Sequence, residues 1–206
     1  LDLPRSASPE RMTKLTRRVA PGLNVVDSNT LVDALTGVAY TNTGVTVLAR
    51  LNTAVTVSNT TTETTVFTYA DDGSHLETNR LLRLTVMGTI TDSALDTATT
   101  VALRLKYGGT TMATKTVTTD DGANTIGSSQ GFRLVFDLLA VDSSSSQISY
   151  LSGTVPKLTV VTEAIALRGT ATEDSSAAQD LILTFDWNNA AAAASITLDA
   201  AVLEWL

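Results

Sequence analysis

A two-residue alternation of apolar and polar side chains between Arg80 and Met112 constrains the fold of this chain more than any other feature. Successive side chains of a β-strand face opposite sides of the sheet, so an alternation over about eight residues indicates a strand with one buried face. The apolar positions are Leu82, Leu84, Val86, Gly88 and Ile90 in a first run and Val101, Leu103, Leu105 and Tyr107 in a second. Gly108-Gly109 then supplies the positive φ angles of a two-residue hairpin. The segment therefore predicts two long strands followed by a tight turn.

The same alternation continues to the C-terminus and predicts an all-β fold. No candidate strand is followed by a helical pattern, which excludes a parallel sheet with crossover helices. The Ala190–Ala194 run is too short for a stable helix and is expected to be a connection. We expect an antiparallel, jelly-roll-like β-sandwich of about eight strands over residues 63–206, preceded by an extended N-terminal arm. The further candidate strands are Thr65–Tyr69, Thr110–Thr118, Gly131–Val141, Gln147–Gly153, Lys157–Leu167, Leu181–Trp187 and Ser195–Trp205.

Composition excludes several classes of protein. With 43% hydrophobic and 17% charged residues among 206, the chain is not a disordered protein. It contains no Cys, so disulfides and thiolate metal sites are not expected. No apolar run approaches the ~18–20 residues needed to span a bilayer, so no membrane insertion is expected. Whether residues precede Leu1 stays open.

Charge is divided unevenly along the chain. The net charge is −7, but residues 1–20 carry five basic side chains against Asp2 and Glu10, which gives +3 there and −10 in the remainder. An acidic body repels phosphates, so no nucleic-acid partner is expected. Residues 1–23 also hold three of the four prolines, which favours an extended arm, either a solvated tail or a segment that docks on an acidic neighbouring subunit. The docking residues would be Arg5, Arg11, Lys14, Arg17 and Arg18.

Residues 24–62 have a weaker pattern than the rest of the chain. Short alternations occur at 45–51 and 54–57, and the polar run at 59–63 interrupts them. We interpret residues 24–62 as a linker or as accessory short strands outside the sandwich.

The sequence offers few groups for catalysis or metal binding. His75 is the only histidine, and one His without Cys cannot supply the usual zinc sets or a Cys-His nucleophile pair. No nucleophile motif such as G-x-S-x-G is present, so we expect no enzyme activity and no cofactor, with His75 as a loop residue. The triplets Asp71-Asp72-Gly73 and Asp120-Asp121-Gly122 suit β-turns, and a Ca²⁺ site at either pair of carboxylates is the alternative.

The last strand appears apolar on both faces near its end. Leu203 and Trp205 follow Thr197 and Asp199 on one face, whereas the preceding apolar residues lie on the other. This indicates either a subunit interface formed by Leu203, Trp205 and Leu206 or a bulge that changes the register.

Several segments resemble jelly-roll domains of tailed-bacteriophage virion proteins, found in capsid decoration proteins and in head and tail fibres. The resemblance covers residues 64–206 and lies in the strand order, in the segments TVFTYADDGSHLETNRLLRLTVMGTITDS and DLILTFDWNNAAAAASITLDAAVLEWL, and in the hairpin Lys106–Thr111. It implies a non-enzymatic structural role, often as a homotrimer anchored by the N-terminal segment. These motifs carry no catalytic residues.

We therefore expect a capsid decoration protein, of cement or head-fibre type, on the virion surface. Residues 1–23 would bind other virion proteins of the capsid or tail, and the jelly roll would be exposed. The alternative is a tail-fibre or receptor-binding module that recognises a host-surface glycan through its loops, and that alternative stays open at this point.

Overall fold

The computed structural model describes residues 45–95, 97–158, 160–191 and 193–206, together with the backbone of three short strands that precede them. The chain divides into two compact units, Leu1–Gly44 and Val45–Leu206. In the first unit, β1 (Leu23–Val25), β2 (Thr30–Asp33) and β3 (Ala39–Thr41) pair in a small antiparallel sheet. The predicted arm, residues 1–23, lies outside the described residues except for Leu23.

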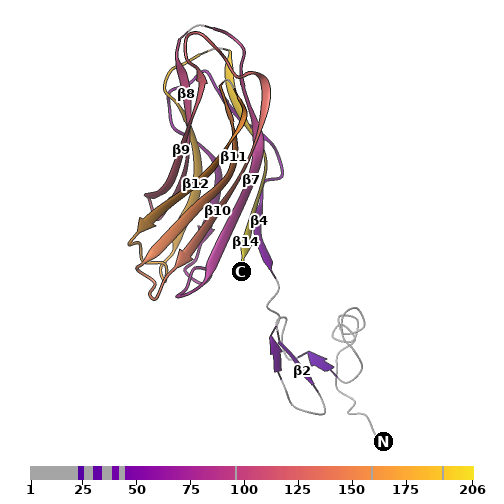
Figure 1. Ribbon diagram of the computed structural model, residues 1–206. Helices are drawn as coiled ribbons and strands as arrows, with labels where there is room; N and C mark the ends of the chain where they lie inside the picture. The colour runs from indigo at the N-terminus through magenta and orange to yellow at the C-terminus, as the bar shows by residue number, and fades with distance from the viewer. Residues whose placement is uncertain are drawn as a thin grey trace, which may run out of the picture. The chain divides into compact units, whose positions relative to one another are not determined.

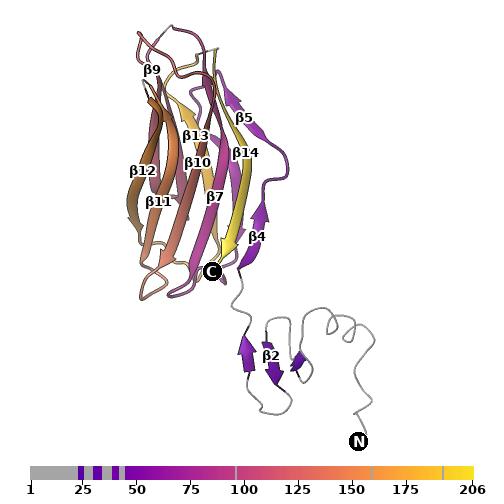
Figure 2. The ribbon, with the colours of Figure 1, turned by 45° about the vertical axis from the view of Figure 1, so that its right-hand side comes forward.

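The second unit is a sandwich of two antiparallel sheets (Figures 1 and 2). The larger sheet has the order β12-β11-β10-β7-β14, and β4 and β5 both pair with the free edge of β14; the smaller sheet has the order β6-β13-β8-β9. The larger sheet contains β4 (Thr46–Arg50), β5 (Val55–Ser58), β7 (Leu81–Asp92), β10 (Gly127–Ala140), β11 (Gln147–Lys157), β12 (Val160–Ala171) and β14 (Ala194–Trp205). The smaller sheet contains β6 (Thr64–Asp71), β8 (Thr99–Tyr107), β9 (Thr110–Asp120) and β13 (Gln179–Trp187).

The predicted fold class is confirmed. Every strand pair is antiparallel, and the described residues include no helix and thus none that could cross a membrane. Early and late strands pair in both sheets, β7 with β14 and β8 with β13, which is the nested pairing of a jelly-roll-like sandwich. Gly108 and Gly109 form the predicted hairpin with φ values of 57° and 90°.

The apolar positions predicted from the alternation form the core. Leu82, Leu84, Val86 and Ile90 of β7 are buried, as are the alternate residues of β8, β10 and β13. Trp187, Tyr107, Phe136 and Phe185 are among the largest fully buried side chains, and the rings of Phe132 and Phe185 join the two sheets edge to face at 6.3 Å. The side chains on one face of a sheet are buried only when another layer covers that face. The alternation of apolar and polar residues therefore predicts two packed sheets.

One side of the sandwich is closed by a close approach of β9 to β11 and β12. Ser149 Oγ donates a hydrogen bond of 2.8 Å to the carbonyl oxygen of Met112. Gly169 lies so near the same carbonyl that a Cβ atom there would overlap it. Lys115 on β9 and Glu163 on β12 form an ion pair of 3.2 Å across this side.

The structure corrects the interpretation of residues 24–62. β4 and β5 belong to the sandwich, because both pair with β14. Val57 is buried in the core, and the Trp187 indole Nε1 donates a hydrogen bond of 3.2 Å to the Val57 carbonyl oxygen. The boundary between the units lies at Gly44/Val45 rather than near residue 63. Each of these strands has five residues or fewer, too short for an alternation to show that it belongs to a core.

This boundary predicts the behaviour of two truncated chains. Residues 45–206 should unfold with nearly the stability of the sandwich in the full chain. Residues 63–206 should be less stable by about 3 kcal/mol or more, because Val57 and its neighbours no longer cover the core and the edge of β14 loses its partners. Urea denaturation followed by circular dichroism measures both. Equal stabilities of the two truncated chains would contradict the assignment of β4 and β5 to the sandwich.

Candidate functional site

The five basic residues of the predicted docking arm, Arg5, Arg11, Lys14, Arg17 and Arg18, lie outside the described residues. The structure therefore assigns them neither a contact nor a conformation. The candidate sites among the described residues therefore lie in the sandwich.

The predicted interface residues at the C-terminus do not share one surface. Leu203 is 0% exposed and belongs to the core, so the prediction of an interface contact at this residue is wrong. The cause is the bulge that was the alternative prediction, because the register of β14 against β7 shifts between Leu198 and Ala200. Before the bulge the even-numbered residues of β14 face the core, and after it the odd-numbered residues Ala201 and Leu203 do. Trp205 is half-buried and Leu206 is exposed.

The outer face of the larger sheet carries exposed apolar side chains around an ion pair of 2.7 Å between Arg83 and Asp137. Tyr150 on β11, Met87 on β7 and Val47 on β4 are 50%, 41% and 40% exposed. The register places Arg168, Tyr150, Asp137, Arg83, Glu204 and Val47 in one row across this face. Half-buried apolar side chains alternate outward beside that row: Leu81, Val135, Leu139, Ile148 and Val202. Large exposed apolar side chains gathered on one face are typical of a contact surface.

The outer face of the smaller sheet has a different character. Glu63 forms an ion pair of 2.7 Å with Lys106, and Arg104 reaches Asp186 at 2.9 Å and Glu63 at 3.8 Å. The hydrogen bond from Lys106 is the main cause that lowers the pKa of Glu63. The remaining outward residues of β9 are largely Thr. The outer face of the smaller sheet is therefore polar, as is typical of a surface exposed to solvent.

The Asp120-Asp121-Gly122 triplet is explained by turn chemistry. Asp121 Oδ1 accepts hydrogen bonds from the backbone N–H groups of Ala123 at 2.9 Å and Asn124 at 2.7 Å, and these lower the pKa of its carboxyl. Gly122 has a φ of 83°, a conformation that favours glycine. The local hydrogen bonds account for the sequence of this turn.

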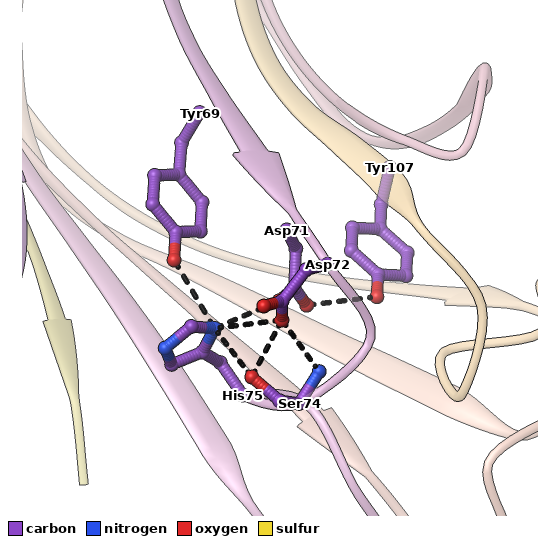
Figure 3. A network of polar contacts seen from close by, with 6 residues as sticks. All are labelled: Tyr69, Asp71, Asp72, Ser74, His75 and Tyr107. Atoms are coloured by element: carbon purple, nitrogen blue, oxygen red, sulfur yellow. Dashed lines mark hydrogen bonds and ion pairs between the residues drawn. The ribbon is translucent and has the colours of Figure 1, made fainter.

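The Asp71-Asp72-Gly73 triplet also forms a turn, but its first carboxylate has another role. Asp72 Oδ1 accepts hydrogen bonds from the N–H group of Ser74 at 3.0 Å and from its Oγ at 2.5 Å, which lower the pKa of Asp72. The Asp71 side chain is 0% exposed and points to His75 (Figure 3). Its second oxygen accepts a hydrogen bond of 3.4 Å from the hydroxyl of Tyr107.

His75 gathers oxygen atoms around one ring nitrogen. Nδ1 lies 2.9 Å from Asp71 Oδ1, 3.1 Å from the Tyr69 hydroxyl, 3.4 Å from Ser74 Oγ and 3.7 Å from Asp72 Oδ1 (Figure 3). We call Asp71, Asp72 and His75 the Asp-Asp-His cluster. His75 was predicted to be a plain loop residue. Its spacing of three and four residues from the two aspartates is the only feature of the sequence that indicates the cluster.

Burial and the carboxylates of the cluster both affect the pKa values of two neighbouring tyrosines. Burial raises the pKa of Tyr107, and the carboxylates of Asp71, Asp174 and Glu173 raise it further. Burial also raises the pKa of Tyr69, with smaller contributions from Asp71 and Asp72. The carboxylates near the cluster thus disfavour any further negative charge.

The Asp-Asp-His cluster does not form a catalytic triad with the neighbouring Ser74. In a triad the serine and the aspartate hydrogen-bond different ring nitrogens, so that one nitrogen takes the serine proton while the aspartate holds the imidazole in the required tautomer and orientation. Here Ser74 Oγ and Asp71 approach the same atom, Nδ1, and Ser74 Oγ donates to Asp72. The arrangement can hold a cation or a proton, but it cannot activate Ser74 as a nucleophile.

A shallow, open hollow of about 460 Å³ lies beside the cluster. Four of its eight lining residues are Gly or Ala, and Asp71 contributes to it. The lining residues are Ala70, Asp71, Gly108, Gly109, Ala178, Gln179, Asp180 and Ile182.

Comparison with known proteins gives a fold likeness only. No family model and no curated protein matches the sequence. Among solved structures, the CBM2 module of the evolved Dit of Lactobacillus casei BL23 phage J-1 is similar with a TM-score of 0.38 and 10% identity, over 74% of this chain and 67% of that one. The alginate lyase of Klebsiella pneumoniae is similar with a TM-score of 0.25 and 7% identity, over 63% of this chain and 60% of that one. Both TM-scores are below 0.5, so neither likeness supports an argument about function.

Proposed function

We propose that this protein is a non-enzymatic structural protein of a bacteriophage particle, a capsid decoration protein on the virion surface. The basic arm, residues 1–23, binds the capsid, and the sandwich is exposed to solvent. The observation that supports the proposal is the exposure of large apolar side chains on the outer face of the larger sheet, around the Arg83–Asp137 ion pair, whereas the outer face of the smaller sheet is ion-paired and Thr-rich. A projecting particle protein needs a solvated face and a face for its own copies.

The apolar outer face of the larger sheet contacts further copies of this chain in a homotrimer. Arg168 on β12 and Glu204 on β14 lie at opposite sides of this face and form no ion pair with described residues. A second copy can supply a carboxylate to Arg168, while Tyr150 and Met87 lose their exposure; Glu204 already lies opposite Arg83 in the sheet. Light scattering of the purified full chain checks the assembly: three times the monomer mass of 21.6 kDa is expected, and a monomer at high concentration would contradict it.

The basic arm explains how an acidic protein can bind a particle at one end. Residues 1–20 carry +3 and the rest of the chain −10, so only the arm is attracted to an acidic capsid surface. The motifs of residues 64–206 that resemble phage jelly-roll domains support the assignment to a virion.

Removal of the arm tests the proposal. A chain without residues 1–23 should keep the circular dichroism spectrum of a folded sandwich and lose its incorporation into particles purified by density gradient. A full-length chain in which the five basic residues of the arm are changed to Gln is the matched control for charge, and it should be incorporated poorly as well. Normal incorporation of the shortened chain would refute docking through the arm.

A further inference from the structure

In the Asp-Asp-His cluster, more oxygen atoms surround Nδ1 of His75 than this nitrogen can hydrogen-bond at one time. An imidazole nitrogen carries either one hydrogen or one lone pair, so Nδ1 of His75 can make only one strong hydrogen bond at a time. Four oxygen atoms nevertheless lie within 3.7 Å of it, two of them from carboxylates. The two carboxylate oxygens and the imidazole nitrogen are groups that a divalent cation can use as ligands.

Burial of the Asp71 carboxylate is a second, independent observation. Its side chain is 0% exposed, and His75 is its ion-pair partner; no Lys or Arg of the described residues lies within ion-pair distance of it. A buried carboxylate is costly unless an opposite charge compensates it. Asp174 and Glu173 lie near enough for their negative charge to contribute, after burial and Asp71, to the raised pKa of Tyr107. Among the described residues, His75 is thus the only side chain that can compensate the charge of this buried carboxylate.

We propose that Asp71, Asp72 and His75 bind a divalent transition-metal cation of the Zn²⁺ type. One ligand atom from each residue lies within 4.8 Å of the others, and Nδ1 is 2.9 Å and 3.7 Å from the two carboxylate oxygens. In a tetrahedral zinc site with bonds of about 2.0–2.1 Å, ligand atoms are roughly 3.4 Å apart. Small rotations of the three side chains are therefore sufficient to form the site.

The chemistry of the ligands selects the metal. Imidazole nitrogen favours Zn²⁺, Ni²⁺ and Cu²⁺, whereas Ca²⁺ takes six to eight oxygen ligands and Mg²⁺ retains its water. The calcium site considered from the sequence was based on carboxylates alone, and the participation of His75 changes the expected ion. Binding requires Nδ1 without its proton, which moves to Nε2 or is released to solvent.

The cation has access to the cluster from solvent. The Asp72 side chain is 75% exposed and His75 is 24% exposed, so one side of the site is open and water can complete the coordination. His75 packs edge to face against Trp205 of β14 with 5.8 Å between ring centroids. The metal therefore fixes the end of β6 and the β6–β7 connection beside the C-terminal strand, and the Trp205 indole reports its binding.

Calorimetry on the full chain, stripped of metal with a chelator, tests the proposal. Zn²⁺ should bind with a stoichiometry of one per chain, raise the melting temperature and change the tryptophan fluorescence, while Ca²⁺ and Mg²⁺ at the same concentration should do none of these. Asp72→Asn and His75→Gln should each weaken Zn²⁺ binding at least about tenfold. Asp72 is exposed, so its variant keeps the fold even if His75→Gln unfolds the loop.

Asp174→Asn is the matched control. Asp174 accepts the same pair of hydrogen bonds from Ser176, at 3.0 Å from N–H and 2.5 Å from Oγ, that Asp72 accepts from Ser74, but it has no histidine beside it. Its variant should weaken Zn²⁺ binding far less than Asp72→Asn does, because Asp174 contributes nearby charge but no ligand atom. The absence of stoichiometric Zn²⁺ binding, or an affinity unchanged in Asp72→Asn and His75→Gln, would overturn the proposal. Equal binding of Ca²⁺ that survives His75→Gln would also overturn it.

Discussion

Replacement of Gly88 by alanine is expected to destabilise the sandwich by about 3 kcal/mol. Gly88 lies in the middle of β7, the strand between β10 and β14. A Cβ atom at this position would overlap the carbonyl oxygen of Thr197 and come within 2.8 Å of two ring carbons of Phe132. The Phe132 ring cannot give way easily, because it is itself buried against Phe185 of the opposite sheet. The glycine thus makes room for the contact that joins the two layers.

Gly131→Ala is the control for Gly88→Ala. Gly131 lies on the neighbouring strand β10, and the nearest atom to an added Cβ is the Gly88 carbonyl oxygen at 4.0 Å. This substitution should leave stability unchanged or raise it slightly, because alanine restricts the unfolded chain more than glycine does. Urea denaturation of both variants gives the comparison. A loss of less than about 1 kcal/mol in Gly88→Ala would mean that the core does not have the close packing described.

Replacement of Trp187 by alanine should cost about 3–5 kcal/mol of the free energy of unfolding. Trp187 is 2% exposed and is among the largest side chains of the core. It also donates the hydrogen bond to the Val57 carbonyl oxygen that fixes β5 to the smaller sheet. The substitution therefore removes a large apolar volume and leaves a buried carbonyl oxygen without this donor.

Trp205→Ala is the matched control for Trp187→Ala, since it removes the same side chain from a half-buried position. Trp205 Nε1 makes no hydrogen bond with a described residue, and the ring contacts His75 and Arg80 near the surface. Its loss should cost clearly less than that of Trp187. Thermal and urea denaturation of both variants rank them. The reverse order would show that the core lies elsewhere.

The fold class was predictable because its main strands each have one buried face. β7 and β8 are long enough for their inward residues to repeat four or five times, so the alternation identified them directly. β4 and β5 were not predicted as part of the sandwich, since their assignment depends on β14, which lies more than 130 residues away in the sequence. β1, β2 and β3 have three or four residues each and give no periodic pattern at all.

The local sequence predicts only part of the candidate site, because the rest depends on contacts between residues far apart in the sequence. The sequence revealed that two aspartates and a histidine lie close together, but burial of Asp71 comes from Tyr107 of β8. The interface prediction at Leu203 was wrong because one additional residue in β14, near Asp199, inverts the faces of all residues after it. A bulge of one residue has no signature in the apolar pattern when both faces carry small apolar side chains.

Electron cryomicroscopy of phage particles made with and without this protein is the most direct test of the proposed function. The account predicts additional density on the outer surface of the capsid, in trimers that each match three sandwiches, and its absence from particles that lack the protein. Density at the tail tip, or no difference between the two kinds of particle, would contradict it.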